Sequence, residues 1–144
     1  MATVTYGKLL PARLTDGYIK RAQISYDDPG REHSYRIVWN TLDNEYSFDI
    51  RIPVKSSDIL AEYMGCALVY NIIDALDIKS LTSDSLDQLC GRKIAAKLGI
   101  RKCYNPRSKF HYSINYIKDF AKISTERRKK NTRNHRLSLT SQYM

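Results

Sequence analysis

The sequence predicts a mainly β domain with one long helix, in the order β-β-β-α-β-β. Apolar and polar residues alternate in three consecutive runs between residues 19 and 54, which is typical of half-buried strands. The period then changes to 3.6 over residues 56–76, which is typical of an amphipathic helix. Alternation returns after Gly91, so two further strands are expected.

The first three runs predict an antiparallel meander, because short turn signals separate them. The runs cover residues 19–26, 35–40 and 46–54, with turns at 27–30 and 42–44. Residues 1–18 show no clear period, and we expect them to form a partly flexible N-terminal segment.

The helix is predicted to begin after Ser56-Ser57-Asp58, which supplies an N-cap and a carboxylate near the first turn. Apolar residues such as Leu60, Tyr63 and Met64 should face the core. Gly65 costs about 1 kcal/mol relative to alanine in a helix, so we expect it to pack tightly against a strand. A shorter helix over residues 85–91 is predicted from the capping-box spacing of Ser85 and Gln88.

The last two strands are predicted near residues 93–101 and 110–118, joined by a turn-rich connection at 103–109. Five short antiparallel strands with a helix between the third and fourth are typical of an OB-fold-like small barrel. A twisted α+β sheet with the helix on one face buries the same residues and remains the alternative. The domain would span residues 19–123, followed by a flexible basic C-terminal tail at 124–144.

The positive charge of the chain is concentrated in its second part. The 144 residues carry a formal net charge of +9, but residues 1–84 contain 9 basic and 12 acidic side chains. Residues 85–144 contain 15 basic and 3 acidic ones. Clustered lysines and arginines create a local field that attracts a polyanion, so the distribution favours nucleic acid as the partner.

Catalytic and metal-binding motifs are not evident in the sequence. It contains no phosphate-binding glycine loop, no HExxH and no GxSxG. Asp43, Glu45 and Asp49 could in principle meet a divalent ion, but the first two flank a predicted hairpin turn, so a metal site is not expected there. The three cysteines, Cys66, Cys90 and Cys103, form no C-x-x-C pair and are expected to be buried, reduced thiols. We therefore expect no cofactor, no metal and no enzymatic activity.

The sequence also gives an expectation about the cellular compartment. Its first residues lack the apolar region of a signal peptide. The longest apolar run, residues 63–70, is far shorter than the roughly 20 residues that cross a bilayer. We expect a cytoplasmic protein without a membrane partner, and a homo-oligomer remains open.

A basic row on the fourth strand is the main candidate for binding. Lys93, Lys97 and Arg101 recur at even spacing and share one side of a strand, where they can follow a phosphate backbone. Tyr104, in the predicted connection, would supply a stacking platform. Trp39, Tyr46, Tyr112 and Tyr116 could also stack on bases, but their positions on apolar sides favour core packing. The predicted nucleic-acid-binding residues are Lys93, Lys97, Arg101, Lys102, Tyr104, Arg107, Lys109, Arg127, Arg128, Lys129 and Lys130.

Three segments between Ala61 and Phe120 carry a family resemblance. They are Ile72-Ile73-Asp74-Ala75-Leu76, then Leu86-Asp87-Gln88-Leu89-Cys90-Gly91-Arg92-Lys93-Ile94, and Asn115-Tyr116-Ile117-Lys118-Asp119-Phe120. In these segments the chain resembles short phage proteins of replication and recombination gene clusters. The resemblance implies an OB-fold single-stranded DNA-binding protein of a phage, active in the cytoplasm of a bacterial host. Such proteins commonly end in an acidic tail, whereas this chain ends in a basic one.

The sequence therefore favours a non-catalytic single-stranded DNA-binding protein acting in DNA replication or recombination. Other phage or host replication and recombination proteins are its expected protein partners. Two alternatives remain open. The chain could bind duplex DNA or structured RNA, chiefly through its basic tail. It could also be an interaction protein that modulates a host or phage enzyme, using the acidic residues between 27 and 62.

Overall fold

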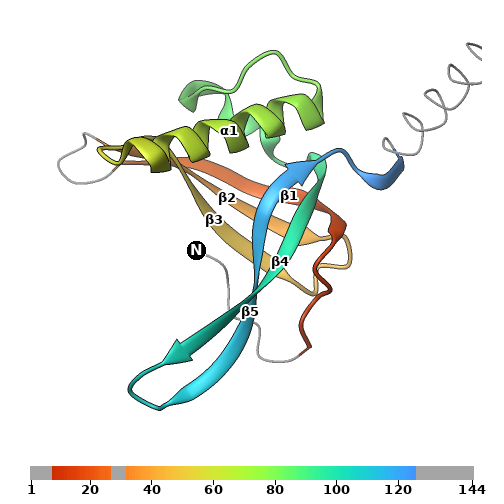
Figure 1. Ribbon diagram of the computed structural model, residues 1–144. Coiled ribbons are helices and arrows are strands. Elements are labelled where there is room, and N and C mark those ends of the chain that lie inside the picture. Colours follow the sequence, from red (N-terminus) through yellow and green to blue (C-terminus); the bar gives the residue numbers. More distant parts are fainter. Residues whose placement is uncertain (1–7, 27–31, 126–144) are drawn as a thin grey trace, which may run out of the picture.

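The computed structural model describes residues 8–26 and 32–125, which form one five-stranded antiparallel sheet, one α-helix and one 3₁₀ helix (Figure 1). This order confirms the predicted β-β-β-α-β-β arrangement. The elements are β1 (Leu14–Tyr26), β2 (His33–Thr41), β3 (Ser47–Lys55), α1 (Ile59–Leu76), the 3₁₀ helix η1 (Ser83–Leu89), β4 (Lys93–Asn105) and β5 (Phe110–Ala121).

The strands lie side by side in the order β3-β2-β1-β4-β5. The first three form the predicted meander. β4 pairs with the beginning of β1, where Leu14 lies opposite Lys97 and Tyr18 opposite Lys93. β3 and β5 are therefore the two edges of the sheet, and in the described residues no hydrogen-bonded ladder joins them.

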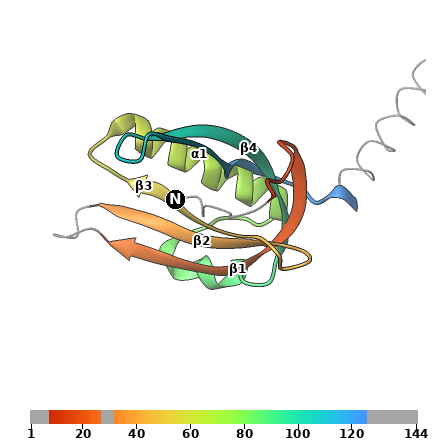
Figure 2. The same cartoon turned by 90° about the horizontal axis from the view of Figure 1, so that it is seen from below.

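α1 contacts both edges of this sheet as well as β4 (Figures 1 and 2). The edges of a flat five-stranded sheet would lie about 19 Å apart, because neighbouring strands are about 4.8 Å apart. In this structure β3 and β5 come into contact with each other, so the sheet is curled and not flat. The arrangement agrees with the predicted OB-fold-like barrel, open between β3 and β5 and covered there by α1.

Two contacts fix α1 to the two edges. A Cβ atom at Gly65 would lie 1.6 Å from the carbonyl oxygen of Pro53 on β3, so the two backbones touch and only glycine fits. This confirms the tight packing predicted for Gly65. At β5, the amide nitrogen of Asn71 donates to both carboxylate oxygens of Asp119, at 2.8 and 3.0 Å.

Both ends of α1 are closed by hydrogen bonds. The Asp58 carboxylate accepts from the backbone N–H groups of Leu60 and Ala61 at 3.1 and 3.2 Å, as predicted for an N-cap. At the other end, the Arg92 guanidinium donates to the carbonyl oxygen of Leu76 at 3.0 Å. Arg92 thus neutralises the negative end of the helix dipole. Its role is structural, although it lies among the basic residues of the second part of the chain.

Trp39 stands at the centre of the core. Its ring is fully buried and packs 5.8 Å from the ring of Phe48. Its indole Nε1 donates to the carbonyl oxygen of Ile94 at 2.9 Å, which ties β2 to β4 across the interior. The remaining fully buried large apolar side chains are Ile19, Ile37, Ile52, Ile72, Leu89, Ile94 and Leu98.

The orientation of α1 differs from the prediction. Leu60, Tyr63 and Met64 were expected in the core, yet their side chains are 67%, 74% and 60% exposed. The buried positions are Gly65, Ile72 and Leu76. The helix is apolar on nearly every side, so the apolar pattern alone does not identify its inner face.

Within the described ranges, α1 is the one helix that is long and apolar enough, by length and composition alone, to cross a membrane. The expectation from residues 63–70 did not capture this, because it counted only an uninterrupted apolar run. In this structure α1 packs against the sheet along Gly65, Ile72 and Leu76.

Several local predictions also need correction. β1 begins at Leu14, inside the segment expected to be partly flexible. Ser124, the first residue of the expected tail, donates its backbone N–H to Asp16 at 2.9 Å. The short helix is a 3₁₀ helix whose Ser85 bonds with Thr82 rather than with Gln88. The cysteines are free but not buried, since two are exposed and one is half-buried.

Candidate nucleic-acid interface

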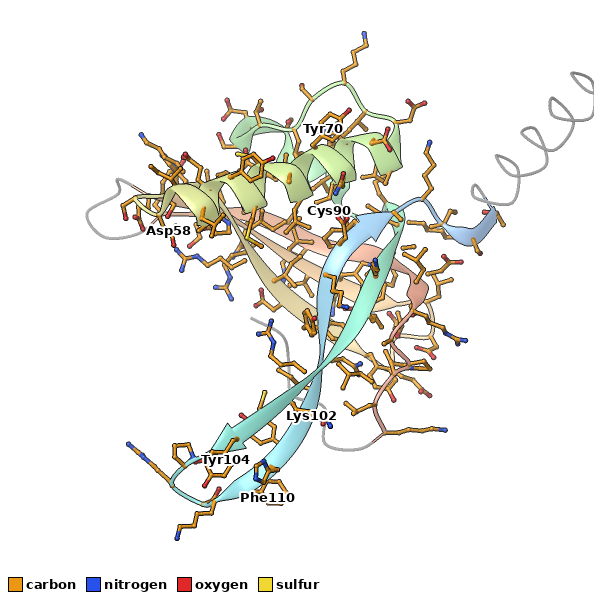
Figure 3. All side chains as sticks on the ribbon, in the orientation of Figure 1. Asp58, Tyr70, Cys90, Lys102, Tyr104 and Phe110 are labelled. Carbon is orange, nitrogen blue, oxygen red and sulfur yellow. The ribbon has the colours of Figure 1, made fainter. Side chains whose placement is uncertain are left out.

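β4 and β5 extend beyond the rest of the sheet as a two-stranded hairpin. β1 pairs with β4 only as far as Lys97, whereas β5 pairs with β4 as far as Asn105 and Phe110. We call residues 99–118 the hairpin arm. It projects away from α1, and Lys102, Tyr104 and Phe110 lie along it (Figure 3).

The tip of the arm is a turn that two local features stabilise. The Asn105 side-chain oxygen accepts the backbone N–H of Arg107 at 3.0 Å, a bond that asparagine forms readily in turns. Lys109 adopts the left-handed conformation with φ of 53°. These contacts hold Arg107 and Lys109 at the exposed end of the arm.

The base of the arm is held by Asn115, which is fully buried. Its side-chain oxygen accepts the N–H of Leu10 at 2.8 Å, and its amide nitrogen donates to the carbonyl oxygens of Leu10 and Gly99 at 2.9 and 3.3 Å. A Cβ atom at Gly99 would lie 2.6–2.8 Å from atoms of Lys118 and Tyr116. The missing side chain of Gly99 therefore lets these two residues cross over β4.

The two sides of the arm carry different aromatic groups. Tyr104 and His111 are cross-strand partners whose ring centroids lie 4.7 Å apart. On the other side, the Arg101 guanidinium lies over the Tyr116 ring, 4.6 Å from its centroid, and Lys118 approaches the same ring at 5.9 Å. One side therefore presents a tyrosine ring against an imidazole ring, and the other presents a tyrosine ring next to two cations.

The arm contains five basic side chains and no aspartate or glutamate. In the described part of the chain, none of the five takes part in an ion pair. Three rings on the arm are exposed, with Phe110 at 63%, Tyr104 at 51% and Tyr112 at 36%. The arm can thus offer unpaired cations to phosphates and open ring faces to bases. Its five exposed cations are Arg101, Lys102, Arg107, Lys109 and Lys118.

The predicted row Lys93, Lys97 and Arg101 is exposed and keeps to one side of β4 by parity. Its members extend over roughly 26 Å at about 3.3 Å per residue. Lys93 and Lys97 lie where β4 pairs with β1, and Lys97 also faces Asp119 on β5. Arg101 alone belongs to the arm, so the row runs from the barrel wall onto the hairpin.

The other predicted residues separate into three groups. Lys102 and Tyr104 lie on the side of β4 opposite Arg101 by parity, and Tyr104 belongs to the strand rather than to a loop. Arg107 and Lys109 lie in or beside the turn at the tip. The remaining predicted cations, Arg127, Arg128, Lys129 and Lys130, lie outside the described residues.

Two functional candidates, Phe110 and Lys118, escaped the sequence reasoning, and a third, Tyr112, was assigned to the core. The apolar alternation of β5 placed Phe110 and Tyr112 in the core, but the arm extends past the elements that would cover them. On β5 the fully buried residue at this level is Asn115, on the opposite side of the strand. The absence of acidic residues between 99 and 118 was the available signal.

Two aromatic residues named as possible stacking platforms have structural partners instead. Trp39 is in the core, as predicted. Tyr46 is half-buried, and its hydroxyl donates to the carbonyl oxygen of Lys8 at 2.8 Å. Neither ring is as exposed for stacking on a base as the ring of Tyr104.

The acidic residues around the β2–β3 turn serve the turn and the sheet. The Asp43 carboxylate accepts the Thr41 hydroxyl at 2.6 Å and the backbone N–H of Glu45 at 2.9 Å. These bonds hold the pKa of Asp43 below its ordinary value of 3.8. Asp49 pairs with Arg36 at 2.7 Å. Residues 8–26 and 32–125 contain no cluster of three or more His, Cys, Asp or Glu side chains suited to a metal.

A shallow hollow on the outer face of the sheet contains further basic groups. It is lined by residues of β1, β2 and β3, and its charged members are Arg21, Arg36 and Asp49. Because Asp49 pairs with Arg36, this hollow is less positive than the arm. We regard the arm as the better candidate.

Comparison of the chain with protein-family models and with curated protein sequences gave no match.

Proposed function

We propose that this protein binds single-stranded DNA through the hairpin arm and catalyses no reaction. One observation carries the proposal: the arm combines five basic side chains, no carboxylate and three exposed aromatic rings on a projecting ribbon. A place in phage replication or recombination, in the cytoplasm of a bacterial host, is part of the proposal and rests on the resemblance of residues 61–120.

The physical basis is a division of roles along the arm. Lysine and arginine neutralise phosphates and release counterions, so affinity should fall with salt by a slope of about 0.7 per phosphate on a single strand. Bases unstacked from one another can stack on Tyr104, Phe110 or Tyr112, and each stacked base contributes about 1–3 kcal/mol. Cations alone would bind any polyanion, whereas exposed rings favour single strands.

Duplex DNA is the second candidate, and the shape of the arm favours it. A two-stranded β-ribbon fits the major groove, which is about 12 Å wide. In a duplex the bases remain stacked on one another, so the rings of the arm would contribute less. The dependence of binding on Tyr104 therefore separates the two candidates.

The test measures fluorescence anisotropy of a labelled dT oligomer and of a labelled duplex at two salt concentrations. Lys102→Glu combined with Lys109→Glu should weaken dT binding about tenfold or more. The salt slope should become shallower by about 1.4, because two phosphate contacts are lost. Lys20→Glu combined with Lys79→Glu is the matched control, since it changes the net charge equally at two exposed lysines outside the arm. Equal weakening by both pairs would refute the proposal.

Tyr104→Ala should weaken dT binding by roughly 5- to 150-fold, which corresponds to about 1–3 kcal/mol for a stacked base. Tyr104→Phe keeps the ring and should retain the affinity. Tyr26→Ala is the control, because Tyr26 is also exposed and also packs against a histidine ring, His33. Duplex binding that exceeds dT binding and ignores Tyr104→Ala would favour the second candidate.

A further inference from the structure

The outer face of α1 is apolar and has no partner in the described residues. Its exposed side chains include Ile59 at 81%, Leu60 at 67%, Tyr63 at 74%, Met64 at 60% and Tyr70 at 68%. Large contiguous apolar patches of this kind mark interaction sites on soluble proteins. Leu60, Tyr63 and Met64 are apolar, as expected of core residues, but they face away from the sheet.

The exposed face has the spacing of a helix-pairing seam. Leu60, Tyr63, Ala67, Tyr70 and Asp74 follow one another at intervals of three, four, three and four residues. A 3-4-3-4 repeat keeps one stripe of a helix facing another helix. All five positions are exposed. The seam is therefore suited to a second helix.

The charge of α1 argues against nucleic acid or an anionic membrane as the occupant. Residues 59–76 contain two acidic side chains, Glu62 and Asp74, and no lysine or arginine. Phosphates would be repelled there, and helices that lie on anionic bilayers carry lysine and arginine on their polar face. The occupant must be apolar and must tolerate Asp74 at one end of the seam.

We propose that α1 pairs antiparallel with α1 of a second copy of this chain, about a two-fold axis at Ala67. Ala67 is the smallest residue of the seam and lies at its centre, where the two backbones come closest. Residue 60 of one copy then faces residue 74 of the other. The two Asp74 carboxylates stand about 21 Å apart along the helices, whereas parallel pairing would place them together.

The size of the patch matches such an interface. A tyrosine side chain buries about 150–250 Å², so the two tyrosines and three aliphatic side chains offer on the order of 700 Å² per copy. Standard interfaces bury about 800 Å² per partner.

The dimer leaves the hairpin arms free. The arm projects from the side of the molecule opposite α1 (Figure 1), so two-fold pairing through α1 directs the two arms outward. The pairing does not rest on the proposed nucleic-acid function, and it is tested on nuclease-treated protein.

Sedimentation equilibrium of the full chain over a micromolar concentration series is the first test. We expect a species of twice the 16.7 kDa chain mass. Leu60→Glu should raise the dimer dissociation constant about tenfold or more. Leu42→Glu is the matched control, because Leu42 is also an exposed leucine, at 51%, but lies in the β2–β3 turn. A monomeric wild type, or equal dimerisation of both variants and the wild type, would overturn the proposal.

Leu60→Lys tests the antiparallel orientation. Facing Asp74 of the other copy, the lysine should keep the dissociation constant within about tenfold of the wild type, whereas parallel pairing would bring two lysines together and abolish the dimer. Loss of the dimer in Leu60→Lys to the same degree as in Leu60→Glu would reject the antiparallel model. Flotation with phosphatidylcholine and phosphatidylglycerol vesicles that depends on Leu60 would instead assign the face to a lipid surface and would also overturn the proposal.

Discussion

Asn115 shows how a single buried amide controls the position of the hairpin arm. Three hydrogen bonds join its side chain to the backbone of Leu10 and Gly99, so the N-terminal segment and the base of the arm are held by one residue. Its burial in a strand of apolar alternation is explained by these bonds. Most buried polar side-chain atoms in folded proteins have hydrogen-bond partners, and both polar atoms of the Asn115 side chain do.

We expect Asn115→Ala to lower the free energy of unfolding by about 1–3 kcal/mol, because backbone groups of Leu10 and Gly99 lose their partner. Urea unfolding followed by circular dichroism measures the change. Ser113→Ala, on the same strand, should change stability by less than about 0.5 kcal/mol. An equal effect of the two substitutions would contradict this role for Asn115.

Asp43 provides a pH-dependent contribution in the β2–β3 turn. The Thr41 hydroxyl and then the Glu45 N–H favour the carboxylate and lower the pKa of Asp43 below 3.8. A carboxyl group with a depressed pKa contributes stability above its unfolded pKa and loses it as the pH falls through the folded pKa. The contribution should therefore be nearly complete above about pH 5 and should be lost as the pH falls from 3.8 through the lower folded pKa. In Thr41→Val, an NMR titration should show the pKa of Asp43 moving back toward 3.8, and an unchanged pKa would exclude Thr41 as the main cause.

At the scale of the element, Gly65 determines which side of α1 faces the sheet. Alanine normally stabilises a helix by about 1 kcal/mol relative to glycine. At Gly65 the added Cβ would meet the Pro53 backbone at 1.6 Å, so the helix and β3 would have to separate.

We therefore expect Gly65→Ala to destabilise the protein by more than about 2 kcal/mol, opposite in sign to helix propensity. Cys66→Ala, at the neighbouring exposed position, should stay within about 0.5 kcal/mol of the wild type. Thermal unfolding of both variants measures the difference. A more stable Gly65→Ala variant would show that the contact between α1 and β3 is looser than described.

At the scale of the whole molecule, the structure divides the basic charge into parts with different roles. Arg92 closes α1, Lys93 and Lys97 lie on the barrel wall, and the arm holds five further cations. The tail adds six more basic residues beyond the described part. The net charge of +9 is therefore no measure of the binding surface by itself.

A chain that ends at Thr125 should still bind dT oligomers, with lower affinity and a shallower salt slope, because six basic residues are removed. The relative effect of Tyr104→Ala should be the same in the full and the shortened chain. Anisotropy titrations measure the dT affinity of four proteins: the full and the shortened chain, each with and without Tyr104→Ala. Complete loss of binding in the shortened chain would make the tail, and not the arm, the main contact.

The sequence alone determined the order of the elements, the N-cap at Asp58, the place of Trp39 in the core and the basic character of the second part of the chain. Periodicity and local capping chemistry are sufficient for these features, because they depend on neighbouring residues. Tertiary structure alone decided which face of α1 is buried, because that helix is apolar on nearly every side and Gly65 selects the inner side through contact with Pro53. It also decided that β4 and β5 extend beyond the other strands of the sheet. Phe110 and Tyr112 are therefore exposed, although the alternation around them resembles that of a core strand. Burial depends on what lies opposite a side chain, and the sequence pattern does not contain that information.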